Sequence, residues 1–403
     1  MSPASPRVVR GRVVTPTAVL DDGVVVWEGE RLTWVGEAGA APDGLRDAVA
    51  AATPVNGYVL PGLVDLHCHG GGGASFPDAE DLDTARVAVA EHLSHGTTSL
   101  VASLVTAAPE VLRQRTGVLV ALAEAGEIAG IHYEGPFISA DRCGAQNPAA
   151  IQEPNAALTR ELLALGRGHV VTMTLAPEAP GVAGEDGVAG ALAAGGALPS
   201  FGHTVATAPQ SRAAVVEAGR MLADASAARS ARPTVTHLCN GMNPMHHREP
   251  GPIPEFLAAA ADGRLVIELI ADGTHLDPSL VRSFMEIAGR ENVALVTDAM
   301  AAAGMLDGDY QLGSLAVTVA DGVARLTGGT SIAGGTAHLI DVVRTTVAGG
   351  VDLVDAVYSA ATTPAAVLGD DAVGALEAGR RADVVVTDAD LRPMRVVKGG
   401  VEL

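Results

Sequence analysis

Eight short runs of apolar and β-branched residues recur between residues 62 and 300. Stretches rich in Ala, Leu, Glu and Arg, with the spacing of amphipathic helices, separate most of these runs. Buried strands that alternate with helices are typical of βα units, and eight such units predict a closed, TIM-like (β/α)8 barrel of the α/β class. The runs are GLVDLHCH, TTSLVASL, IAGIHYEG, VVTMTLAPE, LPSFGHT, TVTHLCNGM, LVIELIADGTH and NVALVTDAM.

The two ends of the chain have a different pattern. Residues 7–60 contain short alternating strands with Gly and Asp-Gly turns, typical of a small antiparallel sheet, and residues 381–403 have the same character. Two similar flanks around a different middle predict one small β-sandwich domain built from both chain ends. We expect residues 1–60 and 371–403 to form this domain and residues 61–370 to form the barrel.

Polar residues stand at the end of nearly every one of the eight runs. In a (β/α)8 barrel the carboxyl ends of the strands form the active-site face, while the strand bodies stay apolar. The sequence therefore predicts that these side chains meet at one rim of the barrel. They are His67, His69, Glu134, Glu178, His203, His237, His275 and Asp298.

The first run ends in two histidines that flank one cysteine. Because alternate side chains of a strand face the same way, His67 and His69 can both point into the barrel mouth and bind a metal ion. Residues 70–73 are all glycine, which leaves room for a ligand beside them. The alternative is a pair of polar residues whose hydrogen bonds are satisfied at a strand end.

Three further runs supply a two-histidine, one-carboxylate set. Glu134, His203 and His237 end separate strands, and such a set leaves coordination positions open for water and substrate. For Glu134 the alternative is an ion pair with Arg142. Each histidine, taken alone, is equally typical of a packed core position.

Asp298 ends the eighth run. A carboxylate beside a metal site can take a proton from water and deliver it to a departing amine, and the alternative is a helix N-cap. The only lysine, Lys398, lies near the C-terminus, so a carboxylated lysine cannot bridge two ions in the barrel. Glu134 remains as the candidate bridging group.

Composition and charge narrow the class of protein. Of the 403 residues, 48% are hydrophobic and 18% charged, which excludes a disordered chain and suits strands buried on both faces. A net charge of −21 disfavours nucleic acid and anionic membrane partners, so arginine and backbone N–H groups would have to bind any anionic substrate.

The cysteines, Cys68, Cys143 and Cys239, form no C-x-x-C pair, and the first 16 residues have no apolar leader core. We therefore expect a soluble cytoplasmic protein.

The polar strand ends also belong to longer motifs in a characteristic order. The chain contains PGLVDLHCHG, HYEGPFI, TLAPE, GHT, THLCNGM followed by REPG, IADGTH and VTDAMAAAG, which together span nearly its whole length. This ordered set resembles the N-acetylglucosamine-6-phosphate deacetylase family of the amidohydrolase superfamily. Single motifs such as GHT are not specific, whereas the ordered set is.

The resemblance implies a metal-dependent hydrolase that converts N-acetylglucosamine-6-phosphate to glucosamine-6-phosphate and acetate. It implies one or two divalent ions, with zinc or iron expected, and a homodimer. It also implies a role for each matching residue. Glu134, His203 and His237 would hold the principal ion, and His67 and His69 would hold a second ion bridged by Glu134. Asp298 would be the catalytic acid and base, and His275 would contact the sugar and the acetyl group. The phosphate would be bound by Asn240, Gly241 and Arg248, with Arg248 reaching the partner subunit's site.

Three segments depart from the family pattern, and other functions stay open. Gln146 stands where a histidine is frequent, and we expect it among the substrate contacts. Cys239 and Gly241 replace an aromatic residue and an alanine, and the segment 327–338 is a longer, glycine-rich loop. The alternatives are N-acetylgalactosamine-6-phosphate or another amidohydrolase substrate, and, outside the enzymes, a catalytically inactive scaffold. The cysteines are expected to be inert, with a reactive Cys143 as the alternative.

Overall fold

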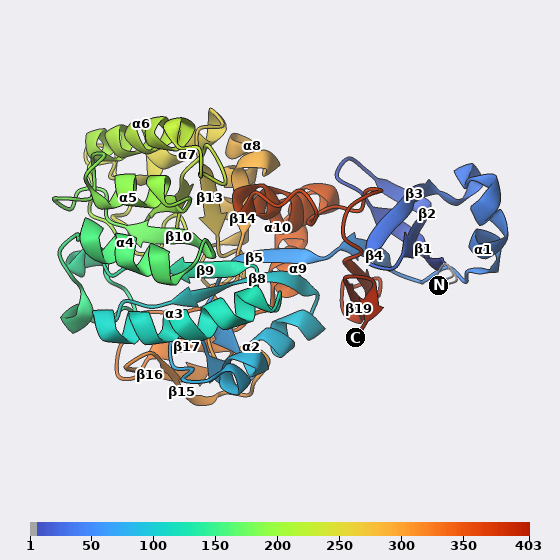
Figure 1. Cartoon of the computed structure of the whole chain (residues 1–403), viewed down its shortest axis with the longest axis horizontal. Helices are drawn as coiled ribbons and strands as arrows, with labels where there is room; N and C mark the ends of the chain where they lie inside the picture. The colour runs from blue at the N-terminus through green and yellow to red at the C-terminus, as the bar shows by residue number, and fades with distance from the viewer. Residues whose placement is uncertain (1–5) are drawn as a thin grey trace.

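The computed structural model describes residues 6–403. Residues 1–5, which the sequence analysis assigns to the small domain, lie outside this part of the chain. The molecule has a large lobe of strands surrounded by helices and a small β lobe at one side (Figure 1). Both chain ends lie in the small lobe, so the chain enters and leaves the barrel on the same side (Figure 1).

Eight parallel strands form the sheet of the large lobe, in the spatial order β14-β13-β12-β11-β10-β9-β8-β5. Backbone hydrogen bonds from Asp298 N to His67 O (2.9 Å) and from His69 N to Ala299 O (2.7 Å) join β14 to β5 and close the ring. The predicted barrel is confirmed, and each of the eight runs contains one strand. The strands are β5 (Leu63–Cys68), β8 (Thr97–Leu104), β9 (Gly130–Tyr133), β10 (Val170–Leu175), β11 (Leu198–Phe201), β12 (Thr234–Val235), β13 (Val266–Leu269) and β14 (Val293–Leu295).

Helices cover the outside of this barrel, and several of them begin at side-chain caps. Asp81 accepts a hydrogen bond from Thr84 N at the start of α2, and Thr207 forms a capping box with Gln210 at the start of α6. The apolar face of each helix packs on the strands, as Leu112 and Leu119 of α3 do. The helices are α2 (Leu82–Ser94), α3 (Pro109–Glu124), α4 (Ala156–Leu165), α5 (Val188–Ala194), α6 (Ala208–Asp224), α7 (Ile253–Ala261), α8 (Pro278–Ala288), α9 (Leu339–Ala348) and α10 (Leu353–Leu368).

The small lobe is a sandwich-like β domain made from both chain ends, as predicted. Its seven strands pair in the order β20-β19-β18-β4-β1-β2-β3. Alternation along β2 places Val25 and Trp27 in one apolar cluster and Val24 and Val26 in another, beside α1 (Arg46–Ala51). The strands are β1 (Arg7–Val14), β2 (Val19–Glu28), β3 (Arg31–Glu37), β4 (Tyr58–Pro61), β18 (Val384–Thr387), β19 (Pro393–Lys398) and β20 (Val401–Glu402).

The small domain departs from the sequence analysis in one respect. β1 pairs with β4 in parallel, whereas the turn pattern predicted antiparallel neighbours throughout. The chain runs through α1 between these two strands, which gives it the length for a parallel return. The exact domain boundaries stay predictions.

A small antiparallel sheet follows the eighth barrel strand. β15 (Gly308–Leu312), β16 (Leu315–Ala320) and β17 (Val323–Leu326) form a meander, and a second short pair, β6 (Gly70–Gly71) and β7 (Ala74–Ser75), follows the first barrel strand. Leu312 and the segment from Thr330 to Gly334 line the cavity at the barrel mouth. This insertion therefore forms one wall of the candidate site.

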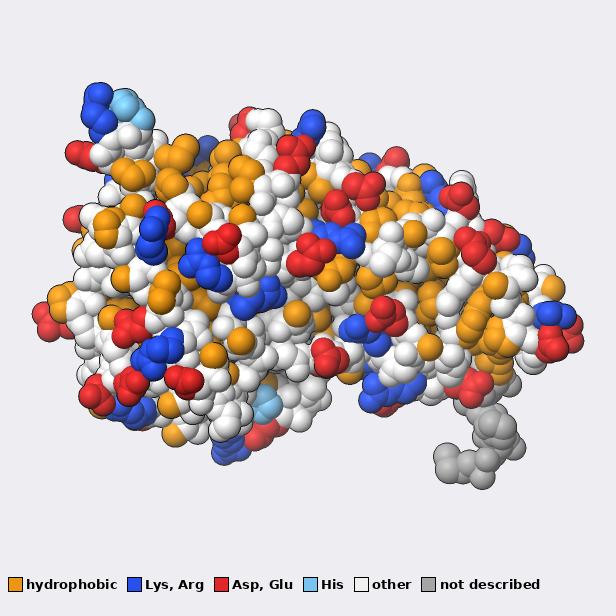
Figure 2. Space-filling model, turned by 90° about the horizontal axis from the view of Figure 1, so that it is seen from above, with side chains coloured by type: hydrophobic (Ala, Val, Ile, Leu, Met, Phe, Trp, Pro, Cys, Tyr) orange, Lys and Arg blue, Asp and Glu red, His pale blue; other side chains and the backbone are white. Residues whose placement is uncertain are grey.

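The surface carries both signs of charge. Figure 2 shows acidic and basic side chains interspersed with apolar ones over the visible face of both lobes. Among residues 6–403, no helix has the length and apolar character needed to cross a bilayer.

Candidate metal and catalytic site

The predicted metal and catalytic residues lie at the carboxyl rim of the barrel, at the ends of their strands or just after them. Three of them have left-handed backbone conformations: φ is 46° at His203, 29° at His237 and 47° at Asp298. Such conformations are uncommon for residues other than glycine and cluster at functional sites. Each turns the chain sharply out of its strand at the residue whose side chain enters the site.

One carboxylate oxygen of Glu134 meets two imidazoles. His203 Nε2 lies 2.8 Å and His237 Nε2 lies 2.9 Å from Glu134 Oε1. All three side chains are buried. Their ligand atoms lie within 4.8 Å of one another, so one ion can contact all three.

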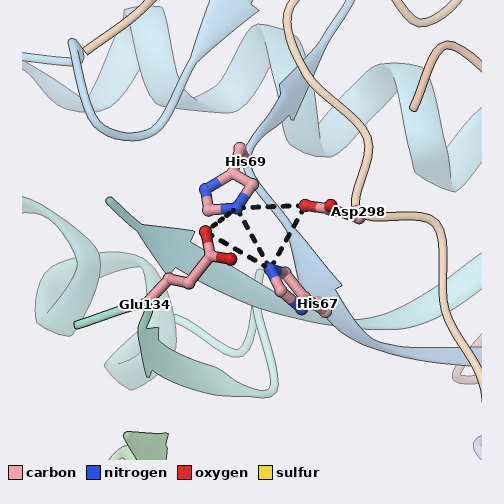
Figure 3. A group of neighbouring side chains, drawn as sticks. All are labelled: His67, His69, Glu134 and Asp298. Atoms are coloured by element: carbon pink, nitrogen blue, oxygen red, sulfur yellow. Dashed lines mark hydrogen bonds and ion pairs between the residues drawn. The ribbon is translucent and has the colours of Figure 1, made fainter. Parts of the chain in front are cut away.

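The other oxygen of Glu134 faces the histidine pair of the first strand. Figure 3 shows His67 and His69 directed toward both Glu134 and Asp298. His69 Nε2 lies 3.0 Å from Glu134 Oε2 and 3.2 Å from Asp298 Oδ1, and His67 Nε2 lies 3.2 Å from Asp298 Oδ1. Glu134 thus contacts both groups through different oxygens, which is the arrangement of a bridging carboxylate.

The opposite ring nitrogens of these histidines are held by the surrounding chain. His69 Nδ1 lies 3.2 Å from Ser103 O, and His203 Nδ1 lies 2.7 Å from Arg142 O. Because a carbonyl oxygen only accepts, Nδ1 must carry a proton in both rings, and Nε2 is the atom directed at the site and available to bind an ion. Metal-binding histidines are typically oriented in this way.

Glu268 orients a third histidine, and the sequence analysis missed it. It lies on β13, its side chain is 1% exposed, and Glu268 Oε2 lies 3.2 Å from His67 Nδ1 and 3.3 Å from His237 N. A carboxylate inside the apolar run LVIELIADG was the available signal, because such a group is costly to bury without partners. Asp272, also missed, holds His275 Nδ1 at 2.8 Å.

The electrostatics of the cluster favour ionised carboxylates. Burial raises the pKa of Glu134, but its contacts with His203 and His237 outweigh burial and place the pKa well below its usual value. Burial likewise raises the pKa of Asp298, and its interactions with His67 and His69 together more than offset this effect. Two ionised carboxylates and four imidazoles in one buried space form a donor set suited to a divalent ion, so these residues fit a metal centre.

Gln146 contacts this cluster through Glu134. Its Oε1 accepts from Thr106 N at 2.7 Å, which directs Nε2 toward Glu134 Oε2 at 2.5 Å. Gln146 also lines the cavity, so the structure places it between the cluster and the space for a substrate. A contact with substrate stays a prediction.

A cavity of about 350 Å³ opens onto the cluster. His275, Asn240 and Gly241 line it, as the sequence analysis expected of substrate-binding residues. Asn240 also donates from Nδ2 to His237 O at 3.4 Å, so part of its hydrogen bonding serves its own loop. Arg248 lies apart, exposed and beside a neighbouring depression that Arg142 and Asn243 also line.

The structure does not show the alternative roles considered for Glu134 and Asp298. Arg142 donates to Asn243 Oδ1 at 2.7 Å and contacts His203 through its carbonyl, and its guanidinium forms no ion pair with Glu134 in the described part of the chain. Asp298 precedes a turn and no helix. Glu178 accepts from Thr204 Oγ1 and from Val205 N, which gives it a structural role beside the site.

The three cysteines are free. Burial raises the pKa of Cys68 well above its usual value and that of Cys239 to about 11, so both favour the unreactive thiol form. Cys143 is half-buried on the loop that precedes Gln146, and its reactivity stays open.

Comparison with known proteins places this geometry in a family. The amidohydrolase family profile, described as "Amidohydrolase family", matches residues 58–401. The chain belongs to the amidohydrolase family. The N-acetylglucosamine-6-phosphate deacetylase of Homo sapiens is 35% identical over 345 residues, covering 83% of this chain and 80% of that protein. The N-acetylgalactosamine-6-phosphate deacetylase of Escherichia coli O157:H7 is 33% identical over 355 residues, covering 84% and 85%.

A solved relative matches the whole fold. It is a mutant N-acetyl-D-glucosamine-6-phosphate deacetylase from Mycobacterium smegmatis in complex with N-acetyl-D-glucosamine-6-phosphate, 39% identical, with a TM-score of 0.88 over 99% of both chains. The resemblance of the ordered motifs to the N-acetylglucosamine-6-phosphate deacetylases is therefore confirmed in sequence and in fold.

Proposed function

We propose that this chain is a metal-dependent hydrolase that converts N-acetylglucosamine-6-phosphate to glucosamine-6-phosphate and acetate. The observation that carries the proposal is the convergence of six side chains at one rim, around the two oxygens of Glu134 and beside a cavity. The names of the relatives described above support the same substrate class. An inactive scaffold would not need this buried and electrostatically demanding set of side chains.

The proposed ion-binding residues are Glu134, His203 and His237 for the first ion and His67, His69 and Glu134 for a second. N and O donors suit zinc and iron, with one or two ions per chain. A bound ion would lower the pKa of a water molecule and polarise the acetyl carbonyl.

Asp298 is proposed to move the proton. Its ionised carboxylate would take a proton from the attacking water and deliver it to the sugar nitrogen as the C–N bond breaks. His275 would bind the acetyl oxygen. Burial lowers the pKa of His275, but Asp272 and Asp298 together raise it by more, which favours protonation of the ring and donation from Nε2.

The phosphate is proposed to bind at Asn240 and the Gly241 backbone, which line the cavity. Arg248 lies outside this cavity in its own chain, which supports its contribution to the partner subunit's site in a homodimer. A guanidinium would offset the repulsion between an anionic substrate and a chain of net charge −21. We propose a cytoplasmic location because the three cysteines are free.

The decisive experiment compares substrates and metal states. Purified protein is incubated with N-acetylglucosamine-6-phosphate, its unphosphorylated form and N-acetylgalactosamine-6-phosphate, with and without a chelator, and the free amine is measured. We expect chelator-sensitive turnover of the phosphorylated gluco sugar. Preference for the galacto epimer would favour the function of the Escherichia coli relative, and no turnover of any amide by metal-loaded protein would contradict the proposal.

A further inference from the structure

A second group of metal-binding side chains lies outside the catalytic cavity. Glu91 and His95 stand at the end of α2, and His338 precedes the first turn of α9. His338 Nε2 lies 2.8 Å and His95 Nδ1 lies 3.4 Å from the same atom, Glu91 Oε1. One ligand atom from each residue lies within 4.8 Å of the other two, as in the catalytic clusters.

One histidine of this group is oriented as metal ligands usually are. His338 Nδ1 lies 3.3 Å from Asp341 Oδ2, which accepts its proton and leaves Nε2 directed at Glu91. His95 Nδ1 lies 2.8 Å from the carbonyl oxygen of Glu91 as well as 3.4 Å from Glu91 Oε1, so this ring must rotate to present a lone pair to an ion. A carboxylate or carbonyl behind the ring is the outer contact that ligating histidines typically make.

No permanently charged cation pairs with the carboxylate of this group. Within the described residues, Glu91 contacts these two histidines and no arginine or lysine. Side-chain exposure is 8% for His338, 22% for Glu91 and 35% for His95, so the group is partly shielded and still open to an ion from solvent. A divalent cation would supply the missing positive charge.

The group also adjoins both chain segments that leave the catalytic centre. A Cβ on Gly304, six residues after Asp298, would lie 2.1 Å from Glu91 Oε1, and a Cβ on Gly72, three residues after His69, would lie 3.2 Å from Glu91 Cβ. Glu91 is therefore packed against the segments that follow β5 and β14.

We propose that Glu91, His95 and His338 form an auxiliary divalent-cation site, distinct in its residues from the catalytic centre. Two imidazoles and one carboxylate suit Zn²⁺ and leave a position for water. The rings of His95 and His338 are stacked, 3.5 Å apart at their centroids, so binding requires them to splay. The more exposed His95 ring can make this movement. A bound ion would join α2 to the start of α9 beside the two catalytic segments.

The test counts zinc ions on the whole protein. Metal-free wild type and His95→Gln are titrated with Zn²⁺ by calorimetry. We expect wild type to bind one more ion per chain than the variant, or to bind that ion at least about tenfold more tightly, because an imidazole ligand is lost. Glu91→Gln, which keeps the side-chain shape but removes the charge, should behave like His95→Gln.

Two controls separate this site from the catalytic centre. His169→Gln changes another partly exposed histidine, at the opposite end of the barrel before β10, and should match wild type. The double variant His67→Ala with His69→Ala should retain the auxiliary ion, whatever happens to turnover. Equal zinc numbers and equal affinities in wild type, His95→Gln and Glu91→Gln would overturn the proposal.

Discussion

Removing Glu268 tests how a carboxylate behind His67 and His237 supports the candidate metal centre. Glu268 Oε2 accepts from two donors at once, His67 Nδ1 at 3.2 Å and His237 N at 3.3 Å, and the side chain is 1% exposed. Glu268→Ala would leave both donors buried without a partner. Glu268→Gln is the matched control, because the amide oxygen can occupy the place of Oε2 and accept from both.

The expected magnitudes follow from these contacts. Loss of an outer contact to a ligating histidine lowers metal affinity by about 10–100-fold, which is about 1.4–2.7 kcal/mol. Each unsatisfied donor should also lower the free energy of unfolding of the metal-free protein by about 1–3 kcal/mol. We expect Glu268→Ala to show both losses and Glu268→Gln to keep most of the stability while losing part of the affinity.

Two assays separate these effects. Competition with a chromophoric chelator measures zinc affinity, and urea unfolding of the chelated protein measures stability. Wild-type zinc affinity in Glu268→Ala would refute the inference that Glu268 orients His67 for metal binding. A stability loss of equal size in Glu268→Gln would refute the claim that one shared oxygen carries both contacts.

Three further changes have expected outcomes. Asp298→Asn should keep its metal and lose about 10²–10⁴-fold in kcat, since one proton-transfer group is removed, and near-normal turnover would exclude the role. Arg248→Ala should raise KM for the phosphorylated sugar by about 10–100-fold, with the unphosphorylated sugar as the control, and an unchanged KM would remove Arg248 from the phosphate site. Burial lowers the pKa of His92 to about 4. In the unfolded chain this histidine is protonated near pH 6.5, whereas in the folded chain it stays neutral down to about pH 4. The free energy of unfolding therefore keeps its full value above about pH 6.5 and falls toward pH 4, by at most about 1.4 kcal/mol per pH unit. Urea unfolding of His92→Asn should therefore depend less on pH than that of wild type, and equal slopes would contradict this.

The barrel and the position of the site residues on its rim were predictable because parallel strands all point the same way. Their carboxyl ends share one face, so a polar residue that ends each apolar run, such as Glu134 or His203, must lie near the others. Placing each residue on the rim required only local patterns, and closing the ring followed from the number of βα units.

The contacts behind the rim could not be predicted in the same way. Ser103 O and Arg142 O hold His69 and His203, but backbone carbonyls have no signature in the sequence. The amide of Gln146 is directed toward Glu134 by Thr106 N, which lies 40 residues earlier in the chain, and no local pattern indicates this contact. The parallel pairing of β1 with β4 likewise depends on packing, because the same alternation suits either direction.

Anomalous X-ray diffraction at the zinc edge from crystals of the zinc-loaded protein tests the central claim most directly. The account predicts a strong peak about 2.1 Å from a carboxylate oxygen of Glu134 and from Nε2 of both His203 and His237. Full occupancy of the protein by zinc with no peak within reach of Glu134 would contradict it.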